Sequence, residues 1–290
     1  MVRGAEHAEH EQPAEQHEPW PGGPPGGPVQ EQGGAEPEQR SPTQPYSAFA
    51  TLKKPNLTEA DMWGMSPIDQ MICRIQYRKA DYAGYYTPPS ENHSIEYPGY
   101  NGGSDWGSVA VDPARGVIVA NYNDMPNYVQ LVPRAVADKK GWEPRGPQGN
   151  TGGGKAEGAG DPQAGVPYAI DVNAGWRMPF TGLLCKQPPY GGITAIDLTT
   201  GKTIWDRPFG TARKNGPFGI ASHLPVTIGT PNNGGAVVTA GGLIFVAATT
   251  DDLIHAIDLQ TGKMLWTAAL PGGGQANVMT YEEGGRQYVV

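Results

Sequence analysis

From residue 105 onward, short apolar runs alternate with turns rich in glycine, aspartate or asparagine. Short runs of this kind, bounded by turn residues, are typical of antiparallel strands. Each of four stretches is predicted to form two strands joined by a turn, as in DWGSVAVDPARGVIVANYND with its Asp-Pro-x-x-Gly connection. The predicted pairs lie at residues 105–124, 191–210, 234–252 and 252–271. This part of the chain is therefore predicted to be all-β.

One short helix is predicted near residues 67–78, in the stretch SPIDQMICRIQY. Ser66 fits an N-cap, Pro67 the first helical position and Asp69 the first turn. Apolar side chains recur at i, i+3, i+4 and i+7 and form one stripe: Ile68, Met71, Ile72 and Ile75. We expect this to be the only substantial helix.

An eleven-residue motif occurs twice, as AIDLTTGKTIW at 195–205 and AIDLQTGKMLW at 256–266. In each copy an aspartate can accept backbone N–H groups across a turn, and a glycine accepts a positive φ: Asp197 and Gly201, then Asp258 and Gly262. The period of 61 residues suits a four-stranded sheet with a long connection. Such a repeat cannot bury its apolar face alone, so the copies must stack on their neighbours.

Each copy of the motif ends on a tryptophan, Trp205 and Trp266, whose side chain buries about 150–250 Å². We expect both indoles to lie against Ala and Gly positions of the adjacent sheet. A large side chain on a small one fixes the distance between stacked sheets. The repeated motif is therefore predicted to be structural.

Residues 1–40 differ in composition from the rest of the chain. They contain no Leu, Ile, Phe or Tyr, so they cannot bury enough apolar surface to offset the entropy of ordering. We predict a disordered low-complexity tail at 1–40 and a folded part at 41–290. The tail holds eight Glu and two Arg, hence −6 of the formal net charge of −8. The remainder is nearly neutral, which argues against a nucleic-acid partner.

Other sequence signals are weak. No apolar run approaches the ~20 residues needed to cross a bilayer, and MVRGAEHAEHEQ is no signal peptide, so no signal or anchor is visible. The two cysteines, Cys73 and Cys185, fit no zinc pattern; two free thiols and one bridge both remain open. GNTGGGK at 149–155 fits half of a phosphate loop, but Ala156 replaces the expected Ser/Thr, which favours a flexible loop.

The repeated motif resembles the tryptophan-docking motif of pyrroloquinoline quinone (PQQ) dehydrogenases, which form an eight-bladed β-propeller. Other stretches are similar to the membrane-bound glucose, quinate and shikimate branch: SPTQPYS, ADMWGMSPIDQMICR, YYTPPSE, PGYNGGSDWGSVAVDP, LVPR, GVPY, CKQPPYGGITAIDL and LPGGGQANVMTYEEGGRQYVV. They run in the family's order from about Ser41 to Val290. The resemblance implies three to four blades of the propeller within 41–290.

The resemblance also implies an activity. The chain would be the C-terminal part of a quinone-linked dehydrogenase (EC 1.1.5 type) at the periplasmic face of the inner membrane. PQQ with Ca²⁺ or Mg²⁺ would be the cofactor, and ubiquinone would accept the electrons. The substrate would be glucose, quinate or shikimate, with NGGSDWGS and ANYNDMPNY closer to the quinate/shikimate members. An oxidising compartment favours a Cys73–Cys185 bridge.

Two residues match family positions near the cofactor. Asn121 in VIVANYND corresponds to an asparagine that hydrogen-bonds PQQ, and Asp251 in AATTDD to an acidic residue near the cofactor pocket. Asp105 and Trp106 lie at a matching strand edge and are interpreted as structural.

No catalytic or metal-binding residue is assigned. The family's catalytic aspartate, a lysine that contacts PQQ and a tryptophan that stacks on it all precede the SPTQP segment, where this chain has only low-complexity sequence. We therefore expect the chain to be incomplete and inactive alone. The alternative is a non-catalytic propeller fragment that acts as a binding module.

Overall fold

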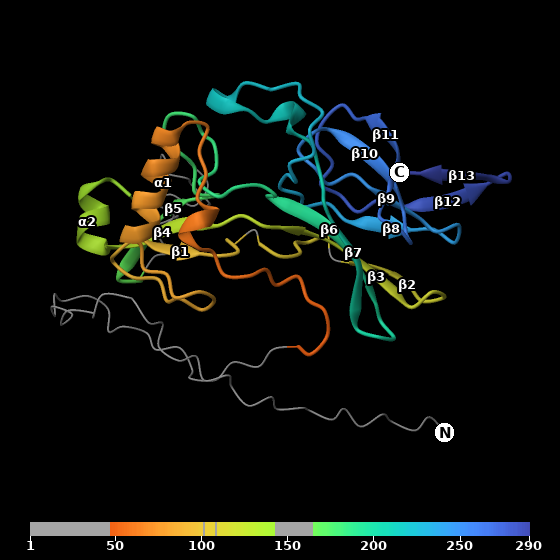
Figure 1. The fold of residues 1–290 in the computed structure, drawn as a ribbon, viewed down its shortest axis with the longest axis horizontal. Coiled ribbons are helices and arrows are strands. Elements are labelled where there is room, and N and C mark those ends of the chain that lie inside the picture. Colours follow the sequence, from red (N-terminus) through yellow and green to blue (C-terminus); the bar gives the residue numbers. More distant parts are fainter. Residues whose placement is uncertain (1–46, 101, 108, 143–164) are drawn as a thin grey trace.

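The computed structural model describes residues 47–100, 102–107, 109–142 and 165–290 (Figure 1). The tail predicted at 1–40 and the glycine-rich stretch at 149–155 lie outside the described residues. The described part is mostly antiparallel sheet, with two α-helices and three short 3₁₀ helices. The 3₁₀ helices are η1 (Glu59–Asp61), η2 (Ala212–Lys214) and η3 (Pro217–Gly219). None of the described helices is long and apolar enough to span a bilayer.

Two four-stranded antiparallel sheets form the larger part of the structure (Figure 1). All four predicted strand pairs are confirmed, and each sheet combines two of them. The first sheet has the order β2-β3-β6-β7: β2 (Val109–Asp112), β3 (Val117–Asn123), β6 (Gly191–Asp197) and β7 (Lys202–Pro208). The second has the order β8-β9-β10-β11: β8 (Ala236–Val238), β9 (Leu243–Val246), β10 (Leu253–Asp258) and β11 (Met264–Ala269). Each sheet has the form of one propeller blade.

The turn predicted within each copy of the motif is confirmed. Asp197 accepts the backbone N–H groups of Thr199 and Thr200 at 2.7 and 2.8 Å, and these bonds hold the pKa of its carboxyl below the usual value. Asp258 accepts the N–H and the hydroxyl of Thr261 in the same way. The closing glycines have positive φ angles of 65° at Gly201 and 67° at Gly262. Sequence and local structure therefore agree at both turns.

Trp205 joins the two blades. Its side chain is only 6% exposed, and its indole N–H donates to the Leu259 carbonyl at 2.8 Å. A Cβ atom at Gly262 would lie 2.7 Å from the indole, so the motif's glycine is needed for this contact as well as for the turn. Behind this contact, one buried cluster draws side chains from both sheets, including Val119, Ile193, Ile244, Val246 and Ile257.

The second copy of the motif is only partly packed. Trp266 is 52% exposed, so the packing expected for it is not found among the described residues. In the first copy, the Gly201 turn is covered by Phe49, and the Ala50 N–H donates to the Gly201 carbonyl at 2.7 Å.

A separate hairpin follows the second blade: β12 (Thr280–Glu283) and β13 (Arg286–Val289). The propeller part of the described structure is thus two four-stranded blades and this hairpin.

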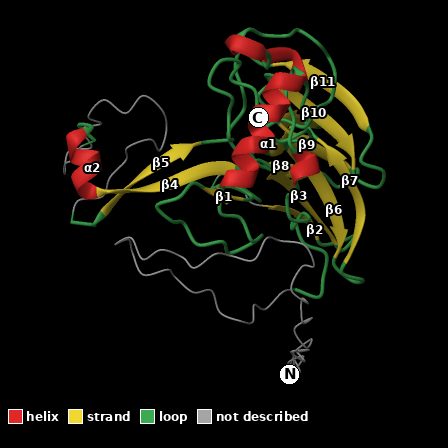
Figure 2. Cartoon of the chain, turned by 60° about the vertical axis from the view of Figure 1, so that its left-hand side comes forward, coloured by secondary structure: helices red, strands yellow, loops and turns green. Residues whose placement is uncertain are grey.

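A third sheet interrupts the first blade. The chain leaves β3, forms β4 (Asn127–Pro133), α2 (Arg134–Lys139) and β5 (Tyr168–Asn173), and returns to pair β6 directly with β3. With β1 (Ser94–Glu96) these strands make a sheet of order β1-β4-β5, which extends away from the blades (Figure 2). The six-residue helix α2 was not predicted, because it is too short for a periodic signal.

The predicted helix is confirmed as α1 (Pro67–Lys79), with a capping box between Ser66 and Asp69. Its predicted apolar stripe is not the buried face: the exposed positions include Ile68, Met71 and Ile75, while Ile72 packs on the core. The face toward the core instead consists of Cys73, Gln76, Tyr77 and Ala80. A disulfide and a hydrogen bond therefore orient this helix together with the apolar contacts of Ile72 and Tyr77.

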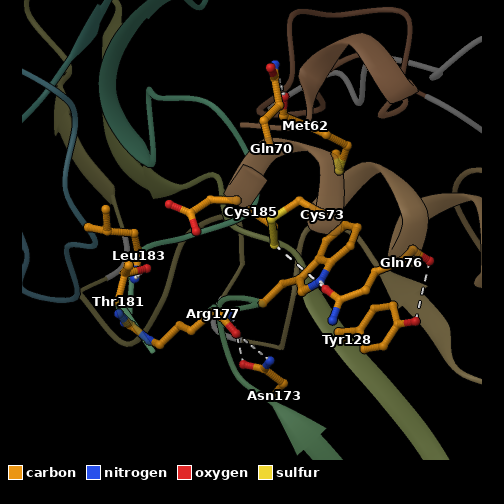
Figure 3. Close-up of a disulfide and its surroundings, with 12 residues drawn as sticks. Met62, Gln70, Cys73, Gln76, Tyr128, Asn173, Arg177, Thr181, Leu183 and Cys185 are labelled. Carbon is orange, nitrogen blue, oxygen red and sulfur yellow. Dashed lines mark hydrogen bonds between the residues drawn. A yellow bond between two sulfur atoms is a disulfide. The ribbon is translucent and has the colours of Figure 1, made fainter. Parts of the chain in front are cut away.

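The tether is a disulfide between Cys73 and Cys185, with a Cα–Cα distance of 5.4 Å (Figure 3). Next to it, the Gln76 side-chain oxygen accepts the indole N–H of Trp176 at 2.8 Å. Trp176 is fully buried and stacks on Tyr128, a residue of β4. The bridge that the family resemblance favours is confirmed, and it fixes α1 to the chain that leads back into the first blade.

Replacement of Trp205 by alanine is expected to lower the free energy of unfolding by about 3–5 kcal/mol, because a buried indole and its hydrogen bond are lost. The same change at the half-exposed Trp266 is expected to cost only about 1 kcal/mol. Urea unfolding followed by circular dichroism measures both values. Equal losses at the two positions would contradict the role assigned to Trp205.

Removal of the disulfide by Cys73→Ser with Cys185→Ser is expected to cost about 2–5 kcal/mol, because the bridge closes a long loop in the unfolded chain. Ellman titration of the folded, unreduced protein should find no free thiol. Dithiothreitol should lower the melting temperature of the wild type and leave that of the double variant unchanged. Two titratable thiols in the unreduced protein would rule out the bridge.

Candidate functional site

Asn121 lies near the end of β3 and is buried, with 4% of its surface exposed. Its side-chain amide donates to the Asn232 side-chain oxygen at 2.8 Å and to the Gly234 carbonyl at 2.8 Å. Both acceptors belong to the loop that enters the second blade, just before β8. Asn121 therefore connects the two blades through polar contacts, as Trp205 does through apolar ones.

Asn232 is the centre of this polar contact. Besides accepting from Asn121, its amide donates to the carbonyls of Tyr122 and Thr230 at 3.0 and 3.1 Å. Its backbone N–H donates to the side chain of Asn123 at 2.8 Å. Sequence reasoning missed Asn232, because an asparagine in a PNNGG loop is most simply a turn residue.

Asp251 follows β9 and is also buried, with 3% exposure. One carboxylate oxygen accepts the N–H and the hydroxyl of Thr211, at 2.8 and 2.9 Å, and the other accepts the Thr249 hydroxyl at 2.5 Å. Thr249 in turn forms a backbone bridge with Asn232. The two cofactor positions predicted from the sequence, Asn121 and Asp251, are thus linked through one intermediate pair of residues.

His255 lies behind Asp251 on β10 and is almost fully buried. Its ring packs edge-on against Phe209, with 4.8 Å between the ring centroids. Burial lowers the pKa of His255, against the opposing effects of Asp251 and of a hydrogen bond with the Val246 backbone. Among the described residues, its Nδ1 atom has no hydrogen-bond partner. A neutral imidazole is therefore favoured here at neutral pH.

The fit of this site to PQQ is partial. Both N–H groups of the Asn121 amide and both oxygens of the Asp251 carboxylate already bind protein groups. Asn121 can therefore donate to a quinone oxygen only by giving up one of its two bonds. Among the described residues there is also no group of three or more His, Cys, Asp or Glu side chains that could hold a metal ion. Protein groups therefore hold Asn121 and Asp251 in place before any cofactor binds, and we call this pair the Asn121–Asp251 wall.

Three glycine-rich loops meet beside this wall. A Cβ at Gly107 would lie 2.5 Å from Gly234, and one at Gly235 would lie 2.2 Å from the Asn277 side chain. The Trp106 indole donates to the Gln275 carbonyl at 3.0 Å, and Asp105 accepts the Trp106 N–H. Trp106 therefore makes a structural contact between the loop before β2 and the loop after β11, while Asp105 bonds the backbone of its neighbour Trp106.

A charged cleft of about 340 Å³ lies between the segment at 54–61 and the loop at 186–189. Lys186 is buried, and its amine binds Asp124 at 3.2 Å and the Pro189 carbonyl at 2.8 Å. Burial lowers the pKa of Lys186, and the Asp124 carboxylate opposes this effect. The Tyr97 hydroxyl also donates to Asp124. Burial raises the pKa of Tyr97, and the nearby Asp124 carboxylate raises it further.

A second pair lines the same cleft. Lys54 binds Asp206 at 2.6 Å and lies over the Tyr122 ring, 4.3 Å from its centroid. The Tyr122 hydroxyl donates to Asp206 at 2.6 Å. Burial raises the pKa of Tyr122, and this hydrogen bond raises it further. Sequence reasoning missed the cleft, because residues far apart in the chain line it. Its charges are paired with one another, which indicates a role in holding segment 54–61 against the first blade.

Replacement of Asn232 by alanine is expected to lower the free energy of unfolding by about 2–4 kcal/mol, because three buried hydrogen bonds are lost and the Asn121 amide keeps only one acceptor. The neighbouring Asn233→Ala is the matched control. It removes one partly buried bond to Asn123 and should cost about 1 kcal/mol. Urea unfolding compares the two. A greater loss for Asn233→Ala would show that Asn232 is not the centre of the network.

Comparison with known proteins supplies the identity of this scaffold. A sequence model of the PQQ family "Glucose/ethanol/alcohol dehydrogenase, beta-propeller domain" matches residues 27–289. The chain is 57% identical over 256 residues to the glycerol dehydrogenase large subunit of Gluconobacter oxydans (strain 621H), which covers 87% of this chain and 34% of that protein.

Two further relatives are a probable quinate dehydrogenase (quinone) and a quinoprotein glucose dehydrogenase. The first, from Xanthomonas campestris pv. juglandis, is 42% identical over 259 residues, covering 87% of this chain and 31% of that protein. The second, from Escherichia coli (strain K12), is 40% identical over 259 residues, covering 89% and 32%. The chain spans about a third of the length of these relatives. With the family match extending over nearly all of its sequence, the chain belongs to the β-propeller domain family of the PQQ-dependent glucose/ethanol/alcohol dehydrogenases.

Proposed function

We propose that this chain is the C-terminal propeller portion of a quinone-linked dehydrogenase (EC 1.1.5 type) that oxidises a sugar or polyol. The observation that carries the proposal is the 57% identity over 256 residues with a glycerol dehydrogenase large subunit. Ubiquinone as acceptor, Ca²⁺ or Mg²⁺ beside the cofactor and a place at the periplasmic face of the inner membrane complete the proposal by family resemblance.

In this proposal PQQ, when bound, supplies the two-electron oxidation of the alcohol. In this proposal the chain itself contributes Asn121 and Asp251 to one side of the cofactor site. Asn121 would hold the cofactor by giving up its bond to Asn232 or Gly234, and would offer it one N–H donor from β3. Asp251 holds Thr211 and Thr249 and so positions the strand ends around that donor. The proton acceptor for the substrate hydroxyl is not assigned to a described residue.

The substrate in this proposal is a polyol, with glycerol ahead of quinate, shikimate and glucose. The identity to the glycerol dehydrogenase large subunit is 57%, against 42% and 40% for the quinate and glucose enzymes. This order differs from the one predicted from NGGSDWGS and ANYNDMPNY, which favour the quinate/shikimate members. For the choice of substrate, we give more weight to the identity along the whole matched region than to these two short motifs.

Reconstitution of the purified chain with PQQ and Ca²⁺ or Mg²⁺ tests the proposal. Quenching of tryptophan fluorescence measures PQQ binding, and reduction of an acceptor dye measures turnover with glycerol, quinate, shikimate and glucose. We expect PQQ to bind, and Asn121→Ala to weaken binding about tenfold, the effect of one hydrogen bond. Asn92→Ala, at an exposed asparagine, is the matched control and should bind as the wild type does. Turnover by the chain alone is expected to be absent.

A non-catalytic binding module is the second candidate. It is favoured by the fact that Asn121 and Asp251 are already bound to protein groups. The two candidates differ in one measurement. Absence of PQQ binding by a folded chain, or equal binding by the wild type and Asn121→Ala, would favour the binding module.

A further inference from the structure

A pocket of about 300 Å³ lies where the third sheet leaves the first blade. The loop at 99–102, the chain between β3 and β4 and the turn that follows β5 surround it. Its volume is at the lower end of the range for small-molecule sites, which suits a ligand about the size of a monosaccharide. We call it the amide pocket, because three asparagines line it: Asn123, Asn127 and Asn173.

Asn127, the first residue of β4, joins two sides of the amide pocket. It is buried, its side-chain oxygen accepts the Gly175 N–H at 2.9 Å, and its amide donates to Glu96 at 2.9 Å. A Cβ atom at Gly99 would lie 2.6 Å from the Asn127 carboxamide, so a glycine is needed for this close approach. The fold thus brings two backbone segments against one buried amide.

The turn after β5 is held in a fixed form by Asn173. Its side-chain oxygen accepts the Arg177 N–H at 2.8 Å, and its amide donates to the Arg177 carbonyl at 2.9 Å (Figure 3). Within this turn Gly175 has a φ of 74° and Trp176 a φ of 47°. A tryptophan in the left-handed region is strained, and strain of this kind is concentrated at ligand-binding and active sites.

Two amides of this pocket keep hydrogen-bonding capacity that Asn121 lacks. A side-chain amide has two N–H donors and one oxygen with two lone pairs. Asn127 and Asn173 each use one donor and one lone pair in the bonds just described. Each therefore keeps one donor and one acceptor. A ligand hydroxyl group, which both donates and accepts, matches such a pair.

The amide pocket also has one charged group. Of the described residues that line it, Arg177 is the only ionisable one. Its guanidinium donates to the Gly182 carbonyl at 3.1 Å, and no carboxylate of a described residue pairs with it. Arginine presents its N–H donors in a planar fork that matches a carboxylate. Because the Arg177 side chain is exposed, this partner for an anion lies at the mouth of the pocket.

We propose that the amide pocket binds a polyhydroxy carboxylate, a small molecule with several hydroxyl groups and one carboxylate. Arg177 binds the carboxylate, and Asn127 and Asn173 bind hydroxyl groups. A neutral polyol would leave the guanidinium without a partner, and a simple anion would leave the two amides unused. Only a ligand that carries both kinds of group uses the whole lining.

The amide pocket adjoins the blade junction and is separate from the Asn121–Asp251 wall. Asn123 lines the pocket, and its side-chain oxygen accepts the Asn232 N–H at 2.8 Å. Neither Asn121 nor Asp251 lines the pocket. The proposal therefore does not rest on the proposed activity, and binding can be measured without PQQ.

Isothermal titration calorimetry of the full chain, without PQQ and at constant ionic strength, tests the site. The probes are sodium gluconate, sorbitol, sodium acetate and inorganic phosphate. Sorbitol is a six-carbon polyol without the carboxylate, and acetate is a carboxylate without hydroxyl groups. We expect gluconate to bind with a Kd of about 1 mM and the other three at least about tenfold more weakly.

Arg177→Gln is expected to lower the affinity for gluconate about tenfold and to remove the preference for gluconate over sorbitol, because the carboxylate loses its partner. Ala174→Met places a longer side chain at the pocket lining without removing a polar group, and should weaken binding at least as much. The matched control is Arg213→Gln, at an exposed arginine of the loop between β7 and β8. It should bind gluconate as the wild type does.

Circular dichroism and the absence of free thiols confirm that each variant is folded. The proposal is overturned if the wild type binds gluconate no more tightly than sorbitol, or if Arg177→Gln binds it as the wild type does. Acetate or phosphate binding as tight as that of gluconate would equally overturn it and indicate a site for simple anions. Equal losses in Arg177→Gln and Arg213→Gln would place the ligand outside the pocket.

Discussion

The packing of the Trp205 indole on the Gly262 turn determines how the two blades sit against each other. A four-stranded sheet of this length has an apolar face that it cannot cover by itself, so its neighbour must supply the cover. The indole sets the separation, because a Cβ at Gly262 would already be too close to it. The buried side chains of both sheets then fill the space behind this contact.

The polar contact at Asn121 and Asn232 lies at the same junction and has a different consequence. A buried network of amides stabilises only the arrangement that satisfies every donor and acceptor, so it specifies the relative position of the blades more strictly than apolar packing does. Asn121 and Asp251 are held by this arrangement before any ligand arrives. A cofactor that binds here must exchange hydrogen bonds with the protein.

The strand pairs and their turns could be predicted because they are local. Alternating apolar residues, Asp at the turn and Gly at its positive φ appear within about ten residues of one another, and the helix start at Ser66 is equally local. The face that α1 buries could not be predicted. The disulfide and the Gln76–Trp176 bond orient it, and both involve partners about a hundred residues away. The cleft between Lys54 and Lys186 was missed for the same reason, whereas helix α2 was missed because six residues give no periodic signal.

Trp205 and Trp266 end nearly identical motifs, yet one is buried and the other half exposed. By itself, the sequence determined the local form of each hairpin, the family and the kind of packing that the motif needs. Only the tertiary structure decided which copy obtains that packing, which asparagine becomes the centre of the blade junction and which apolar side chains stay in solvent. The physical reason is that burial and hydrogen-bond satisfaction depend on groups brought together from distant parts of the chain, whereas turn and strand preferences depend on neighbours in sequence.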